Sequence, residues 1–407
     1  MSHEIRTLNR HLVPETRPTR RQFLKAVGIG GAVVGAGGLG LVSWRATDQG
    51  VFGAGMGPAY DAWGEWDRGS GPITLVRAAI LSANPHNSQP WRFQVSSSAI
   101  DMYADVSRNI GAMDPYLREL HIGLGCSLEN LIIAAKAKGY QPVLTVLPNV
   151  NDPTLIAHVE LGQGIKSEEA LYQAIPQRHT HRAPFDTSRS LSPAALAGLD
   201  QQLAGLAHAE ILWITSDTLK NQIGQLIVEG AQAIAGDRQQ SSDSFRWWRD
   251  SRSDIEQYKD GMTVDAAGLS PLITALAKVL PAQSREQNDQ AWIQQTRDNY
   301  VKTAAAFGVI VVRDPNDNLQ RINGGRLYQR LHLAATTQGM AMQPLNTLTE
   351  RIDRERVLGV APRFTQAVPE LLGAPVMQAL MSFRIGYPTM KTLPSPRRPA
   401  ESVGGKA

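Results

Sequence analysis

The chain has 407 residues, 42% of them hydrophobic and 19% charged, a balance that supports a large folded core and excludes disorder over most of its length. Its net charge of +4 lies in residues 1–25, and the remaining 382 residues carry 35 basic and 35 acidic side chains. Because a neutral body offers no basic footprint, nucleic acid is not an expected partner. The single cysteine, Cys126, excludes an intrachain disulfide and any metal site built from several cysteines.

Two adjacent arginines precede an apolar stretch near the N-terminus. Arg20 and Arg21 lie in the run Thr-Arg-Arg-Gln-Phe-Leu-Lys at 19–25, and residues 26–44 then contain seven glycines and no charged side chain. This region resembles a twin-arginine export signal, which implies that the twin-arginine export machinery carries the folded protein to the periplasm or another extracytoplasmic location. An ordinary basic flank on a membrane helix is the alternative. Since no Ala-x-Ala pattern follows directly, residues 1–50 are predicted to be signal and linker, or an anchor if the signal is not cleaved.

Hydrophobic periodicity predicts two consecutive halves, at 70–166 and 167–399. The first half is predicted to contain a helix at 72–83, strands near 91–96 and 99–105, a helix at 115–138, and strands near 141–148 and 154–162. The second is predicted to contain helices at 167–175 and 192–204, a strand at 209–215, several helices to about 305, a strand at 308–313, helices at 323–338 and 349–358, and a strand at 380–387. Short strands alternating with helices predict an α+β or an α/β layer fold, and α+β is the class expected here.

A weak internal repeat relates the two halves. Residues 122–139 and 322–339 align in register, with glycines at 125 and 325, alanine pairs at 134–135 and 334–335, and a glycine ending each helix. Chance similarity of two alanine-rich helices is the alternative. If the repeat is real, the chain is a dimer written as one polypeptide, with two related three-layer halves. Residues 236–300 have no counterpart in the first half and are predicted to form a helical lid, or a helix that only covers core.

A polar turn at 82–91 interrupts a helix and leads into a strand. It contains the candidate site residues Asn84, His86, Asn87 and Gln89. Amide and imidazole groups are poor core residues unless they are paired, so the turn is suited to a planar ligand with donors and acceptors on its rim.

A basic loop at 178–182 contains Arg178, His179, Thr180 and Arg182. Two arginines four residues apart with a hydroxyl between them can surround a phosphate with charge-assisted hydrogen bonds, although a solvated loop is the simpler reading of the spacing alone. The two histidines at 179 and 181 have no adjacent acidic or thiol partner, so no metal site is predicted.

The turn resembles, through Asn87-x-Gln89-Pro90-Trp91, the turn by which FMN-dependent nitroreductases contact the flavin across a dimer interface. It departs from the family at 83 and 84, where proline and serine are usual. The loop at 178–182 is similar to the phosphate-binding loop of the family, with Thr180 in the serine position. Arg397 is similar to the basic residue that returns to the phosphate after the last strand.

A further match to the nitroreductases lies where the family places backbone against the flavin ring, at Gln343, Pro344 and Leu345. The turn occurs only in the first half of the chain, whereas the phosphate loop and Arg397 occur only in the second. This arrangement resembles the single-chain, double-domain branch of the family. It implies one FMN site, completed by both halves of one chain.

The resemblance implies an FMN-dependent oxidoreductase in which the flavin, rather than a particular side chain, carries the chemistry. Electrons would pass from NAD(P)H or another donor to a small-molecule acceptor such as a nitroaromatic or a quinone. Export weakens the nicotinamide assignment, because NAD(P)H is scarce outside the cytoplasm. The alternatives are an exported protein that sequesters flavin with little turnover, and a membrane-associated pseudo-enzyme with an empty pocket.

Overall fold

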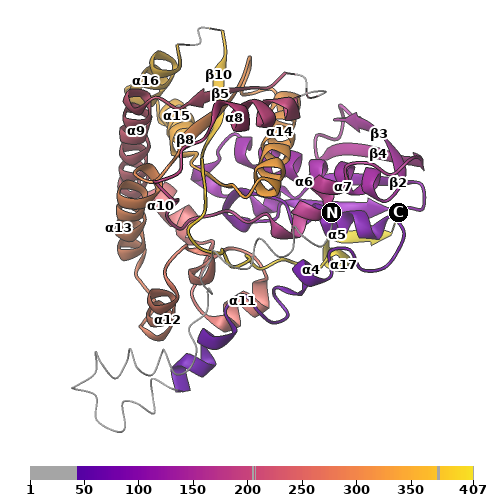
Figure 1. Cartoon of the computed structure of the whole chain (residues 1–407), viewed down its shortest axis with the longest axis horizontal. Coiled ribbons are helices and arrows are strands. Elements are labelled where there is room, and N and C mark those ends of the chain that lie inside the picture. The colour runs from indigo at the N-terminus through magenta and orange to yellow at the C-terminus, as the bar shows by residue number, and fades with distance from the viewer. Residues whose placement is uncertain (1–43, 204–205, 207, 374–375, 407) are drawn as a thin grey trace.

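The computed structural model describes residues 44–203, 206, 208–373 and 376–406, which form two main sheets with helices between and around them (Figure 1). The predicted α+β class is confirmed. The twin-arginine run and the apolar stretch up to residue 43 lie outside the described residues. Among the residues that are described, no helix is long and apolar enough to cross a membrane.

The first sheet has the strand order β11-β1-β2-β4-β3. Its strands are β1 (Trp91–Val95), β2 (Ala99–Ala104), β3 (Tyr140–Val146), β4 (Leu155–Gln163) and β11 (Gly404–Lys406). Side chains of β2 alternate between buried and half-buried, as a strand with one face on the core requires. The buried face is covered by the long helix α6 (Arg118–Ala137), which follows β2 in the chain.

The second sheet has the order β5-β8-β10-β9. Its strands are β5 (Glu210–Ile214), β8 (Ala306–Val312), β9 (Ala341–Pro344) and β10 (Gln378–Gly386). Helix α14 (Asn318–Thr337) connects β8 to β9 and packs on this sheet as α6 packs on the first. Apart from the added β11, the two sheets therefore share one topology, a β-β-α-β-β unit with antiparallel neighbours throughout.

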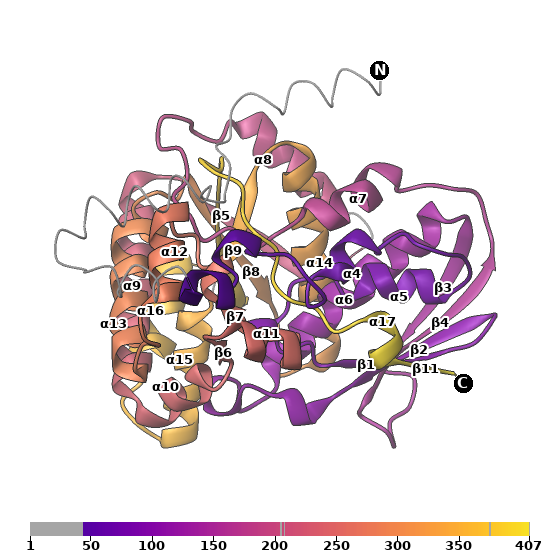
Figure 2. The same ribbon diagram turned by 90° about the horizontal axis from the view of Figure 1, so that it is seen from below.

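The helices α6 and α14 cross each other between the two sheets (Figure 2). A methyl group added at Gly125 would lie 2.1 Å from the carbonyl oxygen of Ile322, and one added at Gly325 would lie 2.1 Å from that of Ile122. The two contacts are equivalent, because residues 125 and 122 of α6 correspond to residues 325 and 322 of α14. Such reciprocal contacts are what a two-fold axis between the helices requires. The internal repeat is thus structural, and its closest approach is at the two glycines rather than at the alanine pairs.

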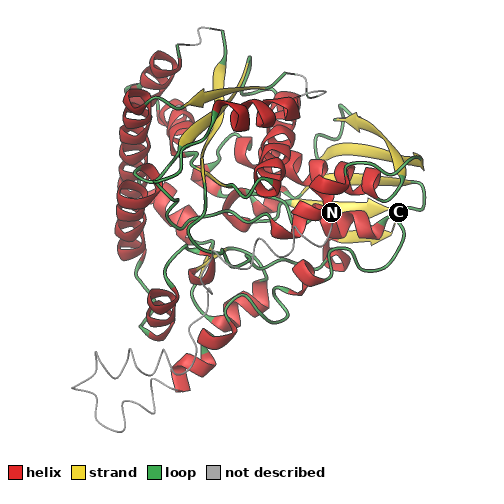
Figure 3. Ribbon diagram, in the orientation of Figure 1, coloured by secondary structure: helices red, strands yellow, loops and turns green. Residues whose placement is uncertain are grey.

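A large insertion separates β5 from β8, whereas three residues join the equivalent strands β1 and β2. It comprises α9 (Asp217–Gly236), α10 (Arg238–Phe245), α11 (Arg252–Tyr258), α12 (Pro271–Val279), α13 (Arg285–Gln295), a π-helical turn (Thr296–Val301) and the short parallel strands β6 (Trp248–Arg249) and β7 (Met262–Thr263). Figure 3 shows that its regular structure is mainly helical. Relative to the first half, the insertion therefore begins at α9 and not at residue 236.

Smaller elements complete the two halves. They are α4 (Asp61–Gly64), α5 (Ile73–Ala79), α7 (Glu169–Ala174), α8 (Pro193–Asp200), α15 (Thr347–Leu358), α16 (Arg363–Leu372) and α17 (Ala400–Val403). The C-terminal strand β11 joins the first sheet, where it runs parallel to β1 with Phe93 opposite Gly404. The chain after β10 consequently crosses from the second half to the first, and residues 394–398 pass close to the turn at 82–91.

Candidate functional site

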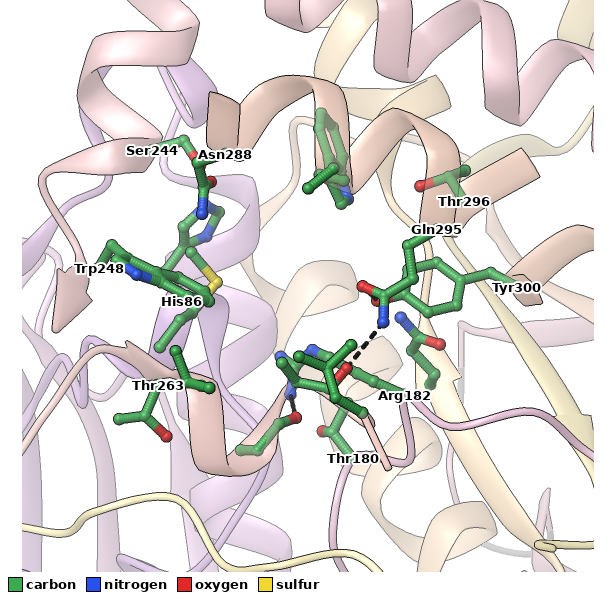
Figure 4. A pocket seen from close by; sticks show the side chains of 18 of the residues that line it. His86, Thr180, Arg182, Ser244, Trp248, Thr263, Asn288, Gln295, Thr296 and Tyr300 are labelled. Atoms are coloured by element: carbon green, nitrogen blue, oxygen red, sulfur yellow. Dashed lines mark hydrogen bonds between the residues drawn. The ribbon is translucent and has the colours of Figure 1, made fainter. Parts of the chain in front are cut away.

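A cavity of about 1310 Å³ lies between the two halves and beneath the insertion. Its walls come from α6, the loop at 180–182, the end of β9 and the insertion. In Figure 4, His86, Ser244 and Trp248 face Gln295 and Tyr300 across the open space, with Thr180 and Arg182 at its edge. The predicted residues that line this cavity are Asn84, His86, Thr180, Arg182, Gln343, Pro344 and Leu345. Three segments that are distant in sequence are thus brought to one cavity.

The turn at 84–89 has an unusual backbone. His86, Asn87 and Gln89 have φ values of 48°, 55° and 54°, a left-handed conformation that costs free energy for residues with a side chain. Asn84 stabilises it, because its Oδ1 accepts a hydrogen bond from the Gln89 backbone N–H at 2.8 Å. The imidazole of His86 hydrogen-bonds Ser244 Oγ of the insertion at 2.8 Å. Burial, with the nearby Arg182 charge, lowers the pKa of His86 to about 4, so this ring is neutral at pH 7.

Asn87 and Gln89 lie behind the cavity wall and not in it. The Asn87 amide donates to the carbonyl oxygens of Gly261 at 3.1 Å and Pro396 at 2.9 Å. Gln89 donates to the carbonyl of Lys259 at 2.8 Å and accepts from the Arg398 backbone N–H at 2.9 Å. These two amides therefore tie the turn to the insertion and to the C-terminal segment.

Arg178 and Arg397 also lie behind the wall, next to the C-terminal end of α5. Arg178 donates to the carbonyl of Leu81 at 2.8 Å, and Arg397 donates to those of Ile80 at 2.8 Å and Ser82 at 3.1 Å. Arg397 also donates to the side-chain oxygen of Asn87. The last carbonyls of a helix attract cations, which explains why two guanidinium groups gather here.

The positive charges of these two arginines are not neutralised by neighbouring carboxylates among the described residues. Their exposed fractions are 2% for Arg178 and 4% for Arg397, and no carboxylate pairs with either of them within the described residues. The Nε and Nη1 atoms of Arg178 have no hydrogen-bond partner. Burial lowers the pKa of Arg178, and burial followed by the charge of Arg178 lowers that of Arg397. A buried guanidinium without a carboxylate partner is costly, so an anion bound close to this pair would stabilise it.

Other polar atoms in the same region are buried without a partner. They include the hydroxyls of Ser82 and Tyr328. The charge of Arg178 acts to lower the pKa of both Tyr328 and His332, so these two side chains lie near the same guanidinium. Such a concentration of orphaned donors and acceptors indicates a bound polar group rather than ordinary core.

His179 packs against Trp63, a residue that the sequence patterns did not single out. The centroids of the His179 and Trp63 rings are 4.4 Å apart. The Arg397 guanidinium also contacts Trp63, at 5.1 Å from the centroid of its ring. The indole N–H donates to the carbonyl of Ser395 at 2.8 Å. Burial, ahead of the charges of Arg178 and Arg397, lowers the pKa of His179 to about 3. The chain that precedes the first half therefore packs over the predicted phosphate loop.

The carboxyl groups of Glu119 and Glu350 also line the cavity, and no motif predicted them. Glu119 Oε2 accepts from Asn346 Nδ2 at 2.6 Å, whereas its buried Oε1 has no partner. Burial, with the neighbouring charge of Asp114, raises the pKa of Glu119 to about 8. Burial, with the charge of Glu119, also raises the pKa of Glu350. Glu119 is therefore mainly protonated at neutral pH, and a protonated carboxyl group can donate a hydrogen bond.

Two alternative chemistries find little support in this geometry. Cys126 lines the cavity, but its thiol is buried against the carbonyl of Gly325 at 3.2 Å and its pKa is raised by burial, which is unfavourable for a nucleophile. The described ranges of the chain contain no group of three or more His, Cys, Asp or Glu side chains that could hold a metal ion.

No protein-family model matches the chain. Over 349 residues it is 26% identical to "Uncharacterized protein Rv3127" of Mycobacterium tuberculosis, which covers 81% of this chain and 92% of that protein. It is 25% identical over 339 residues to "Putative NAD(P)H nitroreductase acg" of the same species, covering 81% of this chain and 94% of that protein.

Solved structures with weaker similarity include the FMN-dependent nitroreductase NfnB from Mycobacterium smegmatis in complex with NADPH. It is 16% identical, with a TM-score of 0.38, and the match covers 59% of this chain and 98% of that one. A nitroreductase with bound FMN from Desulfitobacterium hafniense is 15% identical, with a TM-score of 0.33, covering 57% of this chain and 95% of that one.

Proposed function

We propose that this protein is an FMN-dependent oxidoreductase of the nitroreductase type, with one FMN held between the two halves of a single chain. The observation that carries the proposal is the pair Arg178 and Arg397, two buried guanidinium groups with no carboxylate partner in the described part of the chain. A dianionic phosphate would neutralise both charges and would satisfy the free Nε and Nη1 of Arg178.

The sequence motifs and the relatives support the same assignment. The arginines belong to the segments that resemble the phosphate loop and C-terminal basic residue of nitroreductases. A relative that matches most of this chain is named an NAD(P)H nitroreductase. The cavity of about 1310 Å³ exceeds the roughly 300–1,000 Å³ of ordinary ligand pockets, so it can accommodate a second reactant beside a flavin.

The residues that would hold the phosphate and the ring come from the second half, and the turn of the first half completes the cavity. Arg178, Arg397 and Thr180 would bind the phosphate, while Arg182 and the segment 343–345 would contact the ring. Asn84 and His86 of the first half line the same cavity. When bound, FMN would supply electron transfer, taking two electrons from NAD(P)H or another donor and passing them to a small acceptor such as a nitroaromatic or a quinone.

The chain's own side chains would control access and proton supply. The hydrogen bond of 2.8 Å between His86 and Ser244 Oγ ties the insertion to the turn of the first half, and a bond of 2.9 Å from Gln295 Nε2 to the carbonyl of Ala267 joins two segments of the insertion at the cavity. An insertion held in this way would limit access of water to the cavity. Glu119, whose carboxyl is protonated at neutral pH, would hold a proton at one end of the cavity, next to Asn346.

We also propose that residues 1–50 direct export of the folded, flavin-loaded protein by the twin-arginine route. The paired arginines at 20 and 21 and the charge-free stretch at 26–44 support this proposal. The location would be periplasmic or otherwise extracytoplasmic.

The decisive experiment is to count the flavin. Purified protein should absorb as a flavoprotein and release one FMN per chain when denatured by heat. Two FMN per chain would contradict the single asymmetric site, one FMN per two chains would require an intermolecular site, and a colourless protein would refute the assignment. Turnover with NADPH, compared with chemical reduction by dithionite, would then separate an enzyme from a protein that only sequesters flavin.

A further inference from the structure

Helix α12 of the insertion turns its apolar face outward. The exposed fractions are 41%, 52%, 40% and 59% for Leu272, Ile273, Leu276 and Leu280 respectively. The polar side chains of the same helix, Thr274 and Lys278, are buried, and Lys278 Nζ pairs with Asp265 at 2.8 Å. A helix that only covered a soluble core would have the reverse orientation. The buried ion pair therefore sets the rotation of α12 and leaves its leucines available to a partner.

These exposed side chains form one stripe that continues into the cavity. Leu272 and Leu276 are four residues apart and lie along one face of the helix, and Leu280 follows directly after its last residue. Ile273, Leu276 and Leu280 also line the cavity. These side chains are thus shared between the lining of the cavity and the exposed apolar face of the helix.

The chain that leads from the predicted export signal reaches the same surface. Residues 44–48 are helical and lie beside α12, at the same end of the molecule in Figures 1 and 2. Arg45 Nη2 donates to the carbonyl of Leu280 at 3.3 Å, and Ala46 packs in a cluster with Ala275. Trp44 is 63% exposed, and the residues directly before it, 26–43, contain no charged side chain.

We propose that Trp44 and the exposed face of α12 dock on a lipid bilayer, so that the cavity mouth faces the membrane and a lipid-dissolved reactant enters there. Tryptophan is enriched at membrane–water interfaces, and in the sequence Trp44 directly follows the charge-free stretch at 26–43. At nine residues, α12 is too short to span a bilayer, so it would lie in the interface with its leucines in the lipid. The entry of a reactant rests on the proposed function, whereas the docking itself does not.

The test uses the full chain with a probe on the surface. Leu272→Cys is labelled with a polarity-sensitive fluorophore, because Leu272 lies outside the cavity wall and the native Cys126 is buried. Val143→Cys, on β3 and 56% exposed, is the matched control far from α12. Vesicles of phosphatidylethanolamine and phosphatidylglycerol should shift the emission of the label at 272 to the blue and leave the label at 143 unchanged.

A second arm measures the consequence for the reaction. The double variant Leu272→Gln/Trp44→Gln should reduce the rate with a long-chain quinone in the same vesicles by about tenfold, corresponding to about 1.4 kcal/mol of lost apolar burial. Its flavin content and its rate with a short, water-soluble quinone should stay at the wild-type level. Absence of flavin would refute the proposed function but would leave the labelling result decisive for docking.

Three outcomes would overturn the docking proposal. The first is no emission shift at 272 with vesicles. The second is a blue-shifted label without vesicles at any protein concentration, which would mean that residues 26–43 cover the surface. The third is a shift that grows with protein concentration without vesicles, which would mean that a second copy of the chain covers it.

Discussion

Arg178→Met should weaken FMN binding without destabilising the flavin-free protein. Methionine fills most of the space of the arginine side chain but removes the charge and all five N–H donors. In the structure only one of these donors has a protein partner, the carbonyl of Leu81. The substitution therefore removes an unpaired buried charge from the flavin-free protein and an anion-binding group from the complex.

The size of the effect follows from the contacts. Loss of a hydrogen bond to a charged phosphate costs about 1.5–3 kcal/mol, so the affinity should fall about tenfold to a hundredfold. In the flavin-free protein, the carbonyl of Leu81 loses its donor at a cost of about 1 kcal/mol. Removal of the unpaired buried guanidinium, whose burial costs several kcal/mol, should offset that loss. The melting temperature of the flavin-free variant should thus equal or exceed that of the wild type.

The assay combines FMN titration, followed by flavin fluorescence, with thermal unfolding of the flavin-free protein. The control is Arg354→Met, because Arg354 is also buried but pairs with Asp237 at 2.7 Å and lies outside the cavity wall. That variant should lose about 1.5–3 kcal/mol of stability and keep its FMN affinity. Unchanged FMN affinity in Arg178→Met would refute the anion site, whatever the melting temperature of the variant.

Three further results are expected. Burial raises the folded-state pKa of Glu119 to about 8, so the free energy of unfolding that this group contributes should be fully present below its unfolded pKa and lost as the pH rises toward 8. In thermal melts, the melting temperature of Glu119→Gln should therefore fall less between pH 5 and pH 8 than that of the wild type. Identical pH profiles for the two proteins would contradict the burial of Glu119 as an acid. Gly125→Ala should destabilise the protein by about 1–3 kcal/mol or more, because its methyl group would meet the backbone of the facing helix, whereas Gly236→Ala, with open space around it, should cost little in denaturant unfolding. Replacing Arg20 and Arg21 by lysine should retain the protein in the cytoplasm, as fractionation would show, and normal export of that variant would argue against the twin-arginine route.

Local periodicity was sufficient to predict most of the elements. The strands predicted near 91–96 and 99–105 are β1 and β2, and the helix predicted at 115–138 is α6. The predicted repeat also corresponds to a shared topology. The strands β9 and β11 were missed, because four and three residues are too few to establish an alternating pattern.

The sequence by itself determined which segments carry amides and cations, because those groups are properties of the residues. Only the tertiary structure decided which of them line the cavity: Asn84 and Thr180 do, whereas Asn87 and Arg178 lie behind its wall. Each depends on partners hundreds of residues away, which no local pattern contains.

Local sequence patterns likewise do not determine the protonation state of Glu119 or the direction in which helix α12 faces. An ordinary glutamate at position 119 becomes an acid with a raised pKa because the fold buries it beside other carboxyl groups, and burial is a property of the whole structure. The periodicity of α12 shows that it has an apolar face, but it does not show what covers that face. The ion pair between Lys278 and Asp265 decides this by holding the polar face inward, so that the leucines point away from the core.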